Sequence, residues 1–178
     1  HISHKEIPMY RLKRLFFPIL LMLIMVSSGT PSLAQQIGMT TLVSKGIAGW
    51  YGGSNSQITP DGRYVIFTVP VASTTQAYVY DRQTNSTHMV SVSSLGDVSN
   101  WHVLDVAISD DGNIVAFASY ATNLIPNDTN NRADVFIHNR QTGETSRVSV
   151  DSAGIQANDQ STQVELSGDG RYVSFHAD

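Results

Sequence analysis

Three oxygen-bearing side chains within one short segment are the strongest candidates for ion binding. Asp128, Asn130 and Asp134 follow one another at alternating and then wider spacing, as in loops that wrap Ca²⁺, a hard cation with about six to eight oxygen ligands. The segment has few carboxylates and no glycine at a sharp bend, and Arg132 lies among the donors. A loop whose Asn and Asp side chains bond their own backbone explains these residues better. We therefore predict no cofactor, with Ca²⁺ as the alternative.

The sequence offers no recognisable catalytic set. No cysteine is present to act as a nucleophile, and no serine lies in a Gly-x-Ser-x-Gly elbow. Asp61, Asp111 and Asp169 recur, but each precedes a glycine, so hairpin geometry explains their repetition. The histidines after residue 34 do not recur at corresponding positions and form no metal-binding pair; they are His88, His102, His138 and His176. We predict that the protein is not an enzyme and has no catalytic or cofactor-binding residue.

Three aromatic residues lie in segments that lead from one repeated unit to the next, namely Trp50, Tyr51 and Trp101. Exposed aromatic rings at such positions would be able to stack on a sugar or on a partner protein. Packing between units is the favoured interpretation.

An internal repeat organises the chain from about residue 40 onward. An Asp-Gly turn followed by an apolar strand occurs three times, at spacings of 50 and 58 residues, and a glycine stands 15 residues before each Asp-Gly. The second unit is thus 8 residues longer, with the insertion in or near 127–134. The copies are Asp61-Gly-Arg-Tyr-Val-Ile-Phe67, Asp111-Gly-Asn-Ile-Val-Ala-Phe117 and Asp169-Gly-Arg-Tyr-Val-Ser-Phe175; the glycines are Gly46, Gly96 and Gly154; a second block recurs in Ala77-Tyr-Val-Tyr-Asp-Arg-Gln-Thr84 and Val135-Phe-Ile-His-Asn-Arg-Gln-Thr142.

Each unit predicts a four-stranded antiparallel meander. The Asp-Gly turn joins the first two strands, and a turn at 140–143 joins strands over 134–139 and 146–150. The strand over 114–119 is apolar on both faces, which indicates stacked sheets rather than an open meander with a solvent face. The predicted fold class is all-β, a β-propeller of four-stranded antiparallel blades. A sandwich or a β-solenoid is the alternative.

The positions of the repeats divide the predicted partial propeller, residues 35–178, into four segments. Residues 40–44 are a closing strand, 56–93 blade one, 103–151 blade two and 163–178 half a blade. Propellers have about four to eight blades. We therefore expect the chain to be an incomplete, N-terminal fragment of a longer protein.

The segment 9–34 has the order of a secretory signal. A basic region precedes the apolar run Leu15–Val26, which is shorter than the roughly 20 residues of a membrane-spanning helix, and small residues follow. This order predicts cleavage after Ala34, with an uncleaved anchor or a buried helix as the alternative. Residues 1–8 precede the first methionine and are expected to be upstream sequence. The protein is predicted to be exported to the periplasm or the cell exterior, and to meet the membrane only through its signal.

The composition excludes several classes of partner and linkage. The 178 residues, 41% hydrophobic and 15% charged, are those of an ordinary soluble domain with a net charge of -4. Residues 1–34 contain more basic than acidic side chains. Residues 35–178 are therefore more acidic than the whole sequence and would repel nucleic acid. Because no cysteine is present, there is no disulfide framework and no cysteine-linked lipid anchor.

From about Thr40 to its end the sequence resembles the bacterial WD-repeat-like propellers of the TolB type. The resemblance implies the propeller fold, and for function it implies a periplasmic scaffold, an accessory domain of a peptidase or a repeat region of a large exported protein. It is carried by Ser109-Asp-Asp-Gly-Asn-Ile-Val-Ala-Phe117, Asn123-Leu-Ile-Pro-Asn-Asp-Thr-Asn130, Asp134-Val-Phe-Ile-His-Asn-Arg-Gln-Thr-Gly-Glu144 and Arg147-Val-Ser-Val-Asp151.

Together these observations predict a non-catalytic exported propeller that acts as a scaffold for binding a protein or a glycan. The first alternative is an accessory propeller of a larger exported hydrolase or peptidase, encoded beyond Asp178. The second is a TolB-like scaffold in envelope transport.

Overall fold

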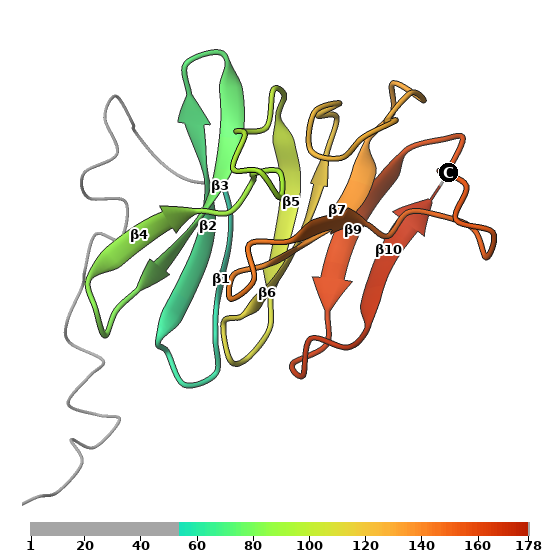
Figure 1. Ribbon diagram of the computed structural model, residues 1–178. Coiled ribbons are helices and arrows are strands. Elements are labelled where there is room, and N and C mark those ends of the chain that lie inside the picture. The colour runs from blue at the N-terminus through green and yellow to red at the C-terminus, as the bar shows by residue number, and fades with distance from the viewer. Residues whose placement is uncertain (1–53, 178) are drawn as a thin grey trace, which may run out of the picture. The chain divides into compact units, whose positions relative to one another are not determined.

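The computed structural model describes residues 54–177, which form strands joined by turns and loops (Figure 1). No helix of this part of the chain has the length and hydropathy needed to cross a membrane. The predicted segments 1–8, 9–34 and 40–44 lie outside the described residues. The strands are β1 (Ser54–Ile58), β2 (Tyr64–Val71), β3 (Thr74–Asp81), β4 (Ser86–Met89), β5 (Val103–Ile108), β6 (Ile114–Ser119), β7 (Asp134–Asn139), β8 (Thr145–Arg147), β9 (Ser161–Leu166) and β10 (Val173–Ala177).

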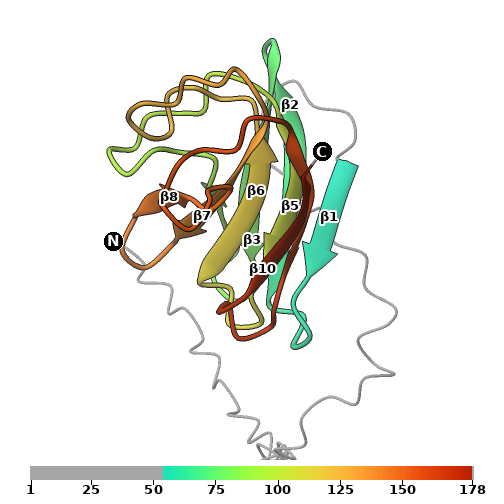
Figure 2. The ribbon, with the colours of Figure 1, turned by 90° about the vertical axis from the view of Figure 1, so that its right-hand side faces the viewer.

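The strands form three antiparallel sheets in the order of the sequence. β1 to β4 make one four-stranded sheet, here called blade one, and β5 to β8 make a second, blade two; β9 and β10 pair as a third sheet. Figure 2 shows the sheets lying one behind another. The four-stranded meander predicted for the two complete units is confirmed.

The Asp-Gly turns join the first two strands of each sheet in the same way. In blade two, the Ser109 hydroxyl donates to Asp111 Oδ1 (2.6 Å), the backbone N–H of Asn113 donates to the same oxygen (2.9 Å), and the N–H of Gly112 donates to the Ser109 carbonyl (2.9 Å). Thr59 with Asp61, and Ser167 with Asp169, repeat the arrangement. The three turns lie at one end of the sheets (Figure 1), here called the turn face.

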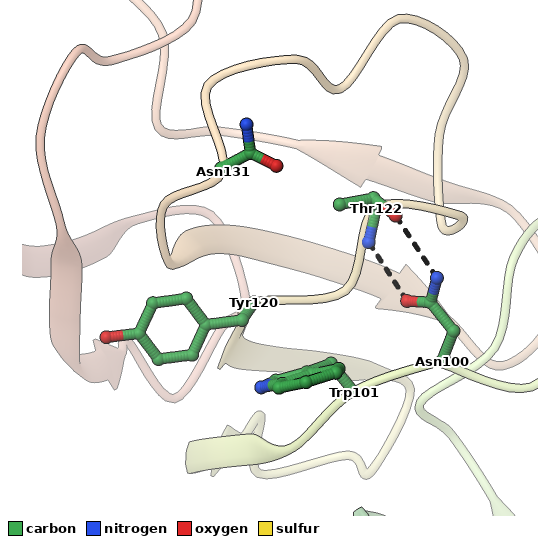
Figure 3. A pocket seen from close by; sticks show the side chains of 5 residues that line it. All are labelled: Asn100, Trp101, Tyr120, Thr122 and Asn131. Atoms are coloured by element: carbon green, nitrogen blue, oxygen red, sulfur yellow. Dashed lines mark hydrogen bonds between the residues drawn. The ribbon is translucent and has the colours of Figure 1, made fainter.

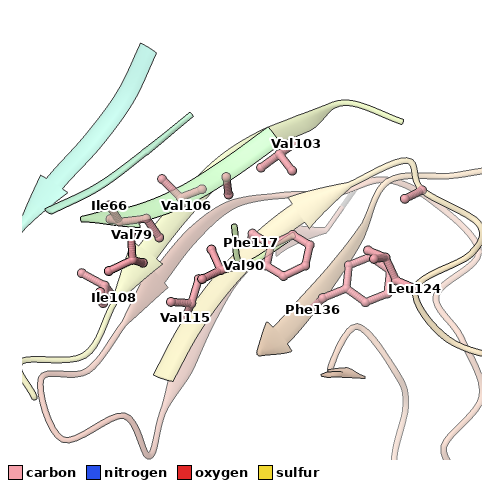
Figure 4. Packing of buried hydrophobic residues seen from close by; sticks show 12 residues of the cluster. Ile66, Val79, Val90, Val103, Val106, Ile108, Val115, Phe117, Leu124 and Phe136 are labelled. Carbon is pink, nitrogen blue, oxygen red and sulfur yellow. The ribbon is translucent and has the colours of Figure 1, made fainter. Parts of the chain in front are cut away.

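Both faces of blade two are buried, as the apolar pattern predicts. Between blades one and two, side chains such as Ile66 and Val79 belong to one buried cluster with Phe117 and Phe136, whose rings stack with their centroids 5.6 Å apart (Figure 4). On the other face, Ala116 and its neighbours pack against the third sheet. Each sheet therefore shares its core with the next, which explains why the second strands lack a polar face.

The first strands of successive sheets are linked by side chains that reach across to backbone groups. The N–H of Ile108 donates to Gln57 Oε1 (3.0 Å), and the Asn55 side-chain amide donates to the Leu104 carbonyl. One unit later, the N–H of Val164 donates to Asp105 Oδ2 (3.0 Å). The first strands thus lie side by side while the fourth strands lie outermost. Sheets stacked in this manner are propeller blades, and the predicted all-β propeller fold is confirmed.

The two blades differ most in the connection between their second and third strands. In blade one, residues 72 and 73 alone join β2 to β3, whereas residues 120–133 separate β6 from β7. The structure thus places the extra residues of the second unit where the sequence predicts them. Residues 90–102 and 120–133 contact one another, since the N–H of Asn100 donates to Asn123 Oδ1 (3.0 Å). These two connections are here called the loop face.

One strand is shorter than predicted. The fourth strand of blade two was expected over 146–150, but β8 ends at Arg147. The Val150 N–H donates to the nearby Val148 carbonyl (2.9 Å), so the chain turns away from β7, and Val150 instead forms an isolated bridge with Gln156.

Replacing Gly112 by alanine is expected to destabilise the protein more than the same change at Gly143. Both glycines have positive φ, 73° and 77°, which costs an alanine roughly 1–2 kcal/mol. A Cβ at Gly112 would also collide with the Tyr64 ring of blade one, whereas one at Gly143 meets nothing within 4 Å. Overpacking adds about 1–3 kcal/mol to the cost at Gly112. Urea unfolding of the two variants measures the difference, and equal losses would show that the Tyr64 contact does not matter.

Candidate functional site

The recurrent acids of the turn face are hydrogen-bonded within their own turns. A side-chain hydroxyl, then a backbone N–H, holds the pKa of each carboxyl below its usual value; the carboxyls are those of Asp61, Asp111 and Asp169. A carboxylate with a depressed pKa carries no proton at neutral pH, so it is a poor general acid. In each turn, Oδ1 of the carboxyl accepts both of these hydrogen bonds.

The metal candidates of the insertion lie around an arginine. Arg147 Nη1 lies 3.2 Å from Asp134 Oδ2 and 3.5 Å from Asp128 Oδ1, and all three side chains are at least nine-tenths buried. Asn130 donates through Nδ2 to Asp134 Oδ2 (3.1 Å) and to the Ala157 carbonyl (2.9 Å). Asp128, Asn130 and Asp134 therefore do come together, but the guanidinium supplies the positive charge that a Ca²⁺ ion would bring.

This buried ionic cluster, formed by Asp128, Asp134 and Arg147, is not fully satisfied. Within residues 54–177, Asp128 Oδ1 and Arg147 Nε have no hydrogen-bond partner. Burial raises the pKa of Asp128, and the charge of Asp134 adds to the rise while Arg147 opposes it. Two carboxylates share one guanidinium, so the cluster is sensitive to any change that removes the cation.

Blade one has neutral side chains where blade two has this ion pair. Gln76 and Met89 stand 58 residues before Asp134 and Arg147. Ser91 donates to Gln76 Oε1 (2.6 Å), just as its counterpart Ser149 donates to Asp134 Oδ1 (2.6 Å). The hydrogen bond to the serine belongs to the repeated blade, whereas the charges belong to blade two alone.

The histidines do not gather into a site. Among residues 54–177, no three His, Cys, Asp or Glu side chains form a group that could hold a metal ion. His138 is buried and shares a hydrogen bond with Thr145 through Nδ1 (2.9 Å); burial, and then the charge of Arg140, lower its pKa. His102 Nδ1 contacts Thr75 Oγ1 (3.2 Å), and His88 is exposed on β4.

A hollow of about 500 Å³ opens on the loop face (Figure 3). Its five lining residues come from the two connections of that face, and all carry neutral side chains: Asn100, Trp101, Tyr120, Thr122 and Asn131. Trp101 is 54% exposed, which is unusual for so large an apolar side chain. We call this hollow the aromatic pocket.

Hydrogen bonds fix the walls of the aromatic pocket. Asn100 and Thr122 bond reciprocally, because the Thr122 N–H donates to Asn100 Oδ1 (3.0 Å) and Asn100 Nδ2 donates to Thr122 Oγ1 (3.1 Å). The Tyr120 hydroxyl donates to Gln160 Oε1 (2.6 Å). Trp101 packs edge to face with His102, with ring centroids 5.9 Å apart. The pocket is therefore preformed.

Sequence reasoning singled out only Trp101 among the five pocket residues. Trp50 and Tyr51, the other two aromatic candidates, lie outside the described residues. Tyr120 and Asn131 border or lie in the insertion, so the signal that would have found them is the extra length of the second unit beside an aromatic connection.

No protein-family model matches the sequence, and a search of curated proteins gives no match. Among solved structures, TolB from Acinetobacter baumannii aligns at 16% identity and a TM-score of 0.45, over 67% of this chain and 25% of that one. The β-propeller domain of the Trilobed protease from Pyrococcus furiosus aligns at 14% identity and a TM-score of 0.48. The alignment covers 71% of this chain and 34% of that one. This chain thus spans about a quarter to a third of their length. Identities this low do not transfer a function to it.

Proposed function

We propose that this protein is a non-catalytic, exported propeller that serves as a binding scaffold, with its ligand on the loop face. The aromatic pocket is the observation that carries the proposal. It is concave, preformed and largely apolar with a few convergent polar groups, which is the usual character of a ligand site. Its volume of about 500 Å³ falls within the range of roughly 300–1,000 Å³ common for such sites.

The other end of the sheets, the turn face, is built differently from the loop face. The turn face consists of repeated turns whose polar groups bond within the chain, such as Asp111 with Ser109. We therefore infer different roles for the two ends of the blades. The turn face joins the first two strands of each sheet, whereas the loop face offers the side chains of the aromatic pocket to a ligand.

Two further elements of the proposal concern export and the type of partner. The signal-like segment 9–34 supports export, and cleavage after Ala34 is its specific form. The negative charge of the chain opposes binding to nucleic acid. N-terminal sequencing of protein exported by a bacterial host is expected to begin at Gln35; an N-terminus upstream of Leu15 would contradict cleavage.

Hydrogen–deuterium exchange on the exported chain tests the choice of face. A panel of soluble polysaccharides is screened for binding, and products are followed by chromatography. With a bound polysaccharide, we expect slower exchange over 90–102 and 120–133, no change in the turns at 59–64 and 109–114, and no cleavage product. Protection confined to the turn face, or turnover of the polysaccharide, would contradict the proposal.

A further inference from the structure

Resting on the proposed function, we propose that the aromatic pocket binds an uncharged saccharide, stacked on Trp101 and hydrogen-bonded by Thr122 and Asn131. Figure 3 shows the Trp101 indole edge-on, with Thr122 and Asn131 on one side of its plane and Tyr120 beside it. One face of the indole is thus turned toward the space that these residues enclose. The C–H face of a pyranose ring is flat and apolar, so it complements an indole face.

The polar groups of the pocket suit hydroxyl groups. Thr122 Oγ1 accepts a hydrogen bond from Asn100, so its own O–H is available to donate. The Asn131 side-chain amide makes no hydrogen bond with the rest of the described residues, and it offers both donors and an acceptor. A sugar hydroxyl is both a donor and an acceptor, so it can pair with either group.

Asn131 is held in place by its neighbours. Its backbone has a φ of 54°, and the residues on either side are tied together, because the N–H of Arg132 donates to Asn130 Oδ1 (3.0 Å). Asn130 in turn bonds to the buried Asp134. Binding therefore need not order the loop first, which lowers the entropic cost of association.

The absence of charged side chains from the pocket lining determines the class of saccharide. A uronate, sulfate or phosphate group bound there would lose water without gaining a cationic partner. The net charge of -4 also repels anionic polymers. A neutral sugar incurs neither cost.

The pocket residues are only partly explained by the repeat. Where blade two has Trp101, the next unit has Asp159, 58 residues later. Where it has Tyr120, blade one has Pro70, 50 residues earlier. The residues shared between units, such as the Asp-Gly turns, build the fold. Asn100 and Trp101 do have counterparts of similar type, Asn158 and Tyr51. The combination with Tyr120 belongs to blade two, where the half-exposed indole is available to stack on a ligand.

The test uses calorimetry on the exported chain with oligosaccharides of one length. The neutral probes are cellohexaose, maltohexaose, xylohexaose and chitohexaose, and the anionic probe is hexagalacturonate. We expect at least one neutral probe to bind and hexagalacturonate not to bind. Trp101→Ala is expected to weaken binding about tenfold or more, and Asn131→Ala roughly threefold to tenfold. Trp101→Phe keeps a stacking ring and retains most of the affinity.

The control is Tyr172→Ala, which removes an aromatic ring that is 66% exposed in the turn before β10, outside the pocket. It is expected to leave affinity unchanged. If Trp101→Ala binds a neutral probe as tightly as the wild type, the assignment of an uncharged saccharide to the aromatic pocket is wrong. The assignment is also wrong if Trp101 is needed instead for binding hexagalacturonate or a protein. In each of these cases the scaffold function stands. If no saccharide and no envelope protein binds the chain, both proposals are wrong.

Discussion

Replacing Arg147 by methionine is expected to lower the free energy of unfolding by about 3–5 kcal/mol at neutral pH. The substitution removes the cation that Asp128 and Asp134 share at 3.5 and 3.2 Å. Both carboxylates are nearly fully buried, so two like charges would face each other without compensation. Urea unfolding of the exported chain, followed by circular dichroism, measures the loss.

The matched control comes from blade one, which has Gln76 and Met89 at the equivalent positions. The double variant Asp134→Gln/Arg147→Met copies this neutral pair and keeps an acceptor for Ser149, as Gln76 accepts from Ser91 at 2.6 Å. We expect it to regain more than half of the stability lost by the single variant, because only Asp128 remains unpaired. A double variant no more stable than Arg147→Met would show that the buried charges are not the cause.

Replacing Phe117 by alanine is expected to cost about 3–5 kcal/mol as well, but for reasons of packing. Phe117 is fully buried in the core between blades one and two and stacks on Phe136. Its removal leaves a cavity lined by side chains of both blades, so the loss is felt by the pair of blades and not by one sheet. Chemical denaturation of the variant beside the wild type gives the difference.

Two comparisons make the Phe117 result specific. Phe117→Leu fills much of the cavity and is expected to cost less than about half as much. Tyr172→Ala, at an exposed position, is expected to change stability by no more than about 0.5 kcal/mol. Because the core is shared, blades one and two should unfold in one transition. Two separate transitions in the wild type would be inconsistent with a shared core.

The sequence predicts the strands well wherever turn chemistry and an apolar run agree. The strand over 134–139 has the predicted bounds, since the apolar run Val135-Phe136-Ile137 is followed by a turn with glycine at 143. The expected strand over 146–150 was too long, because nothing in its residue types announces the hydrogen bond from Val150 to Val148 that ends the ladder. Local pattern fixes strand type better than strand length.

The sites were harder to foresee than the strands. The spacing of Asp128, Asn130 and Asp134 marks them as a group. Arg147, the cation between the two carboxylates, lies at the end of β8 and has no periodic relation to them. The aromatic pocket likewise joins Trp101 to Asn131 across two irregular connections. Such contacts depend on tertiary placement, which neither spacing nor propensity encodes.

The links between first strands also bear on association between molecules. An unpaired strand edge is a template on which another chain can add a strand. On the edge of β5 that does not pair with β6, the Ile108 N–H and the Leu104 carbonyl are already bonded to Gln57 and Asn55 of β1. The edge is therefore occupied by side chains, which satisfy its backbone without extending the sheet. The double variant Asn55→Ala/Gln57→Ala removes these side chains and would leave the Ile108 N–H and the Leu104 carbonyl on the edge of β5 unpaired. Another chain can then add a strand at this edge, which would favour aggregation of partly unfolded molecules.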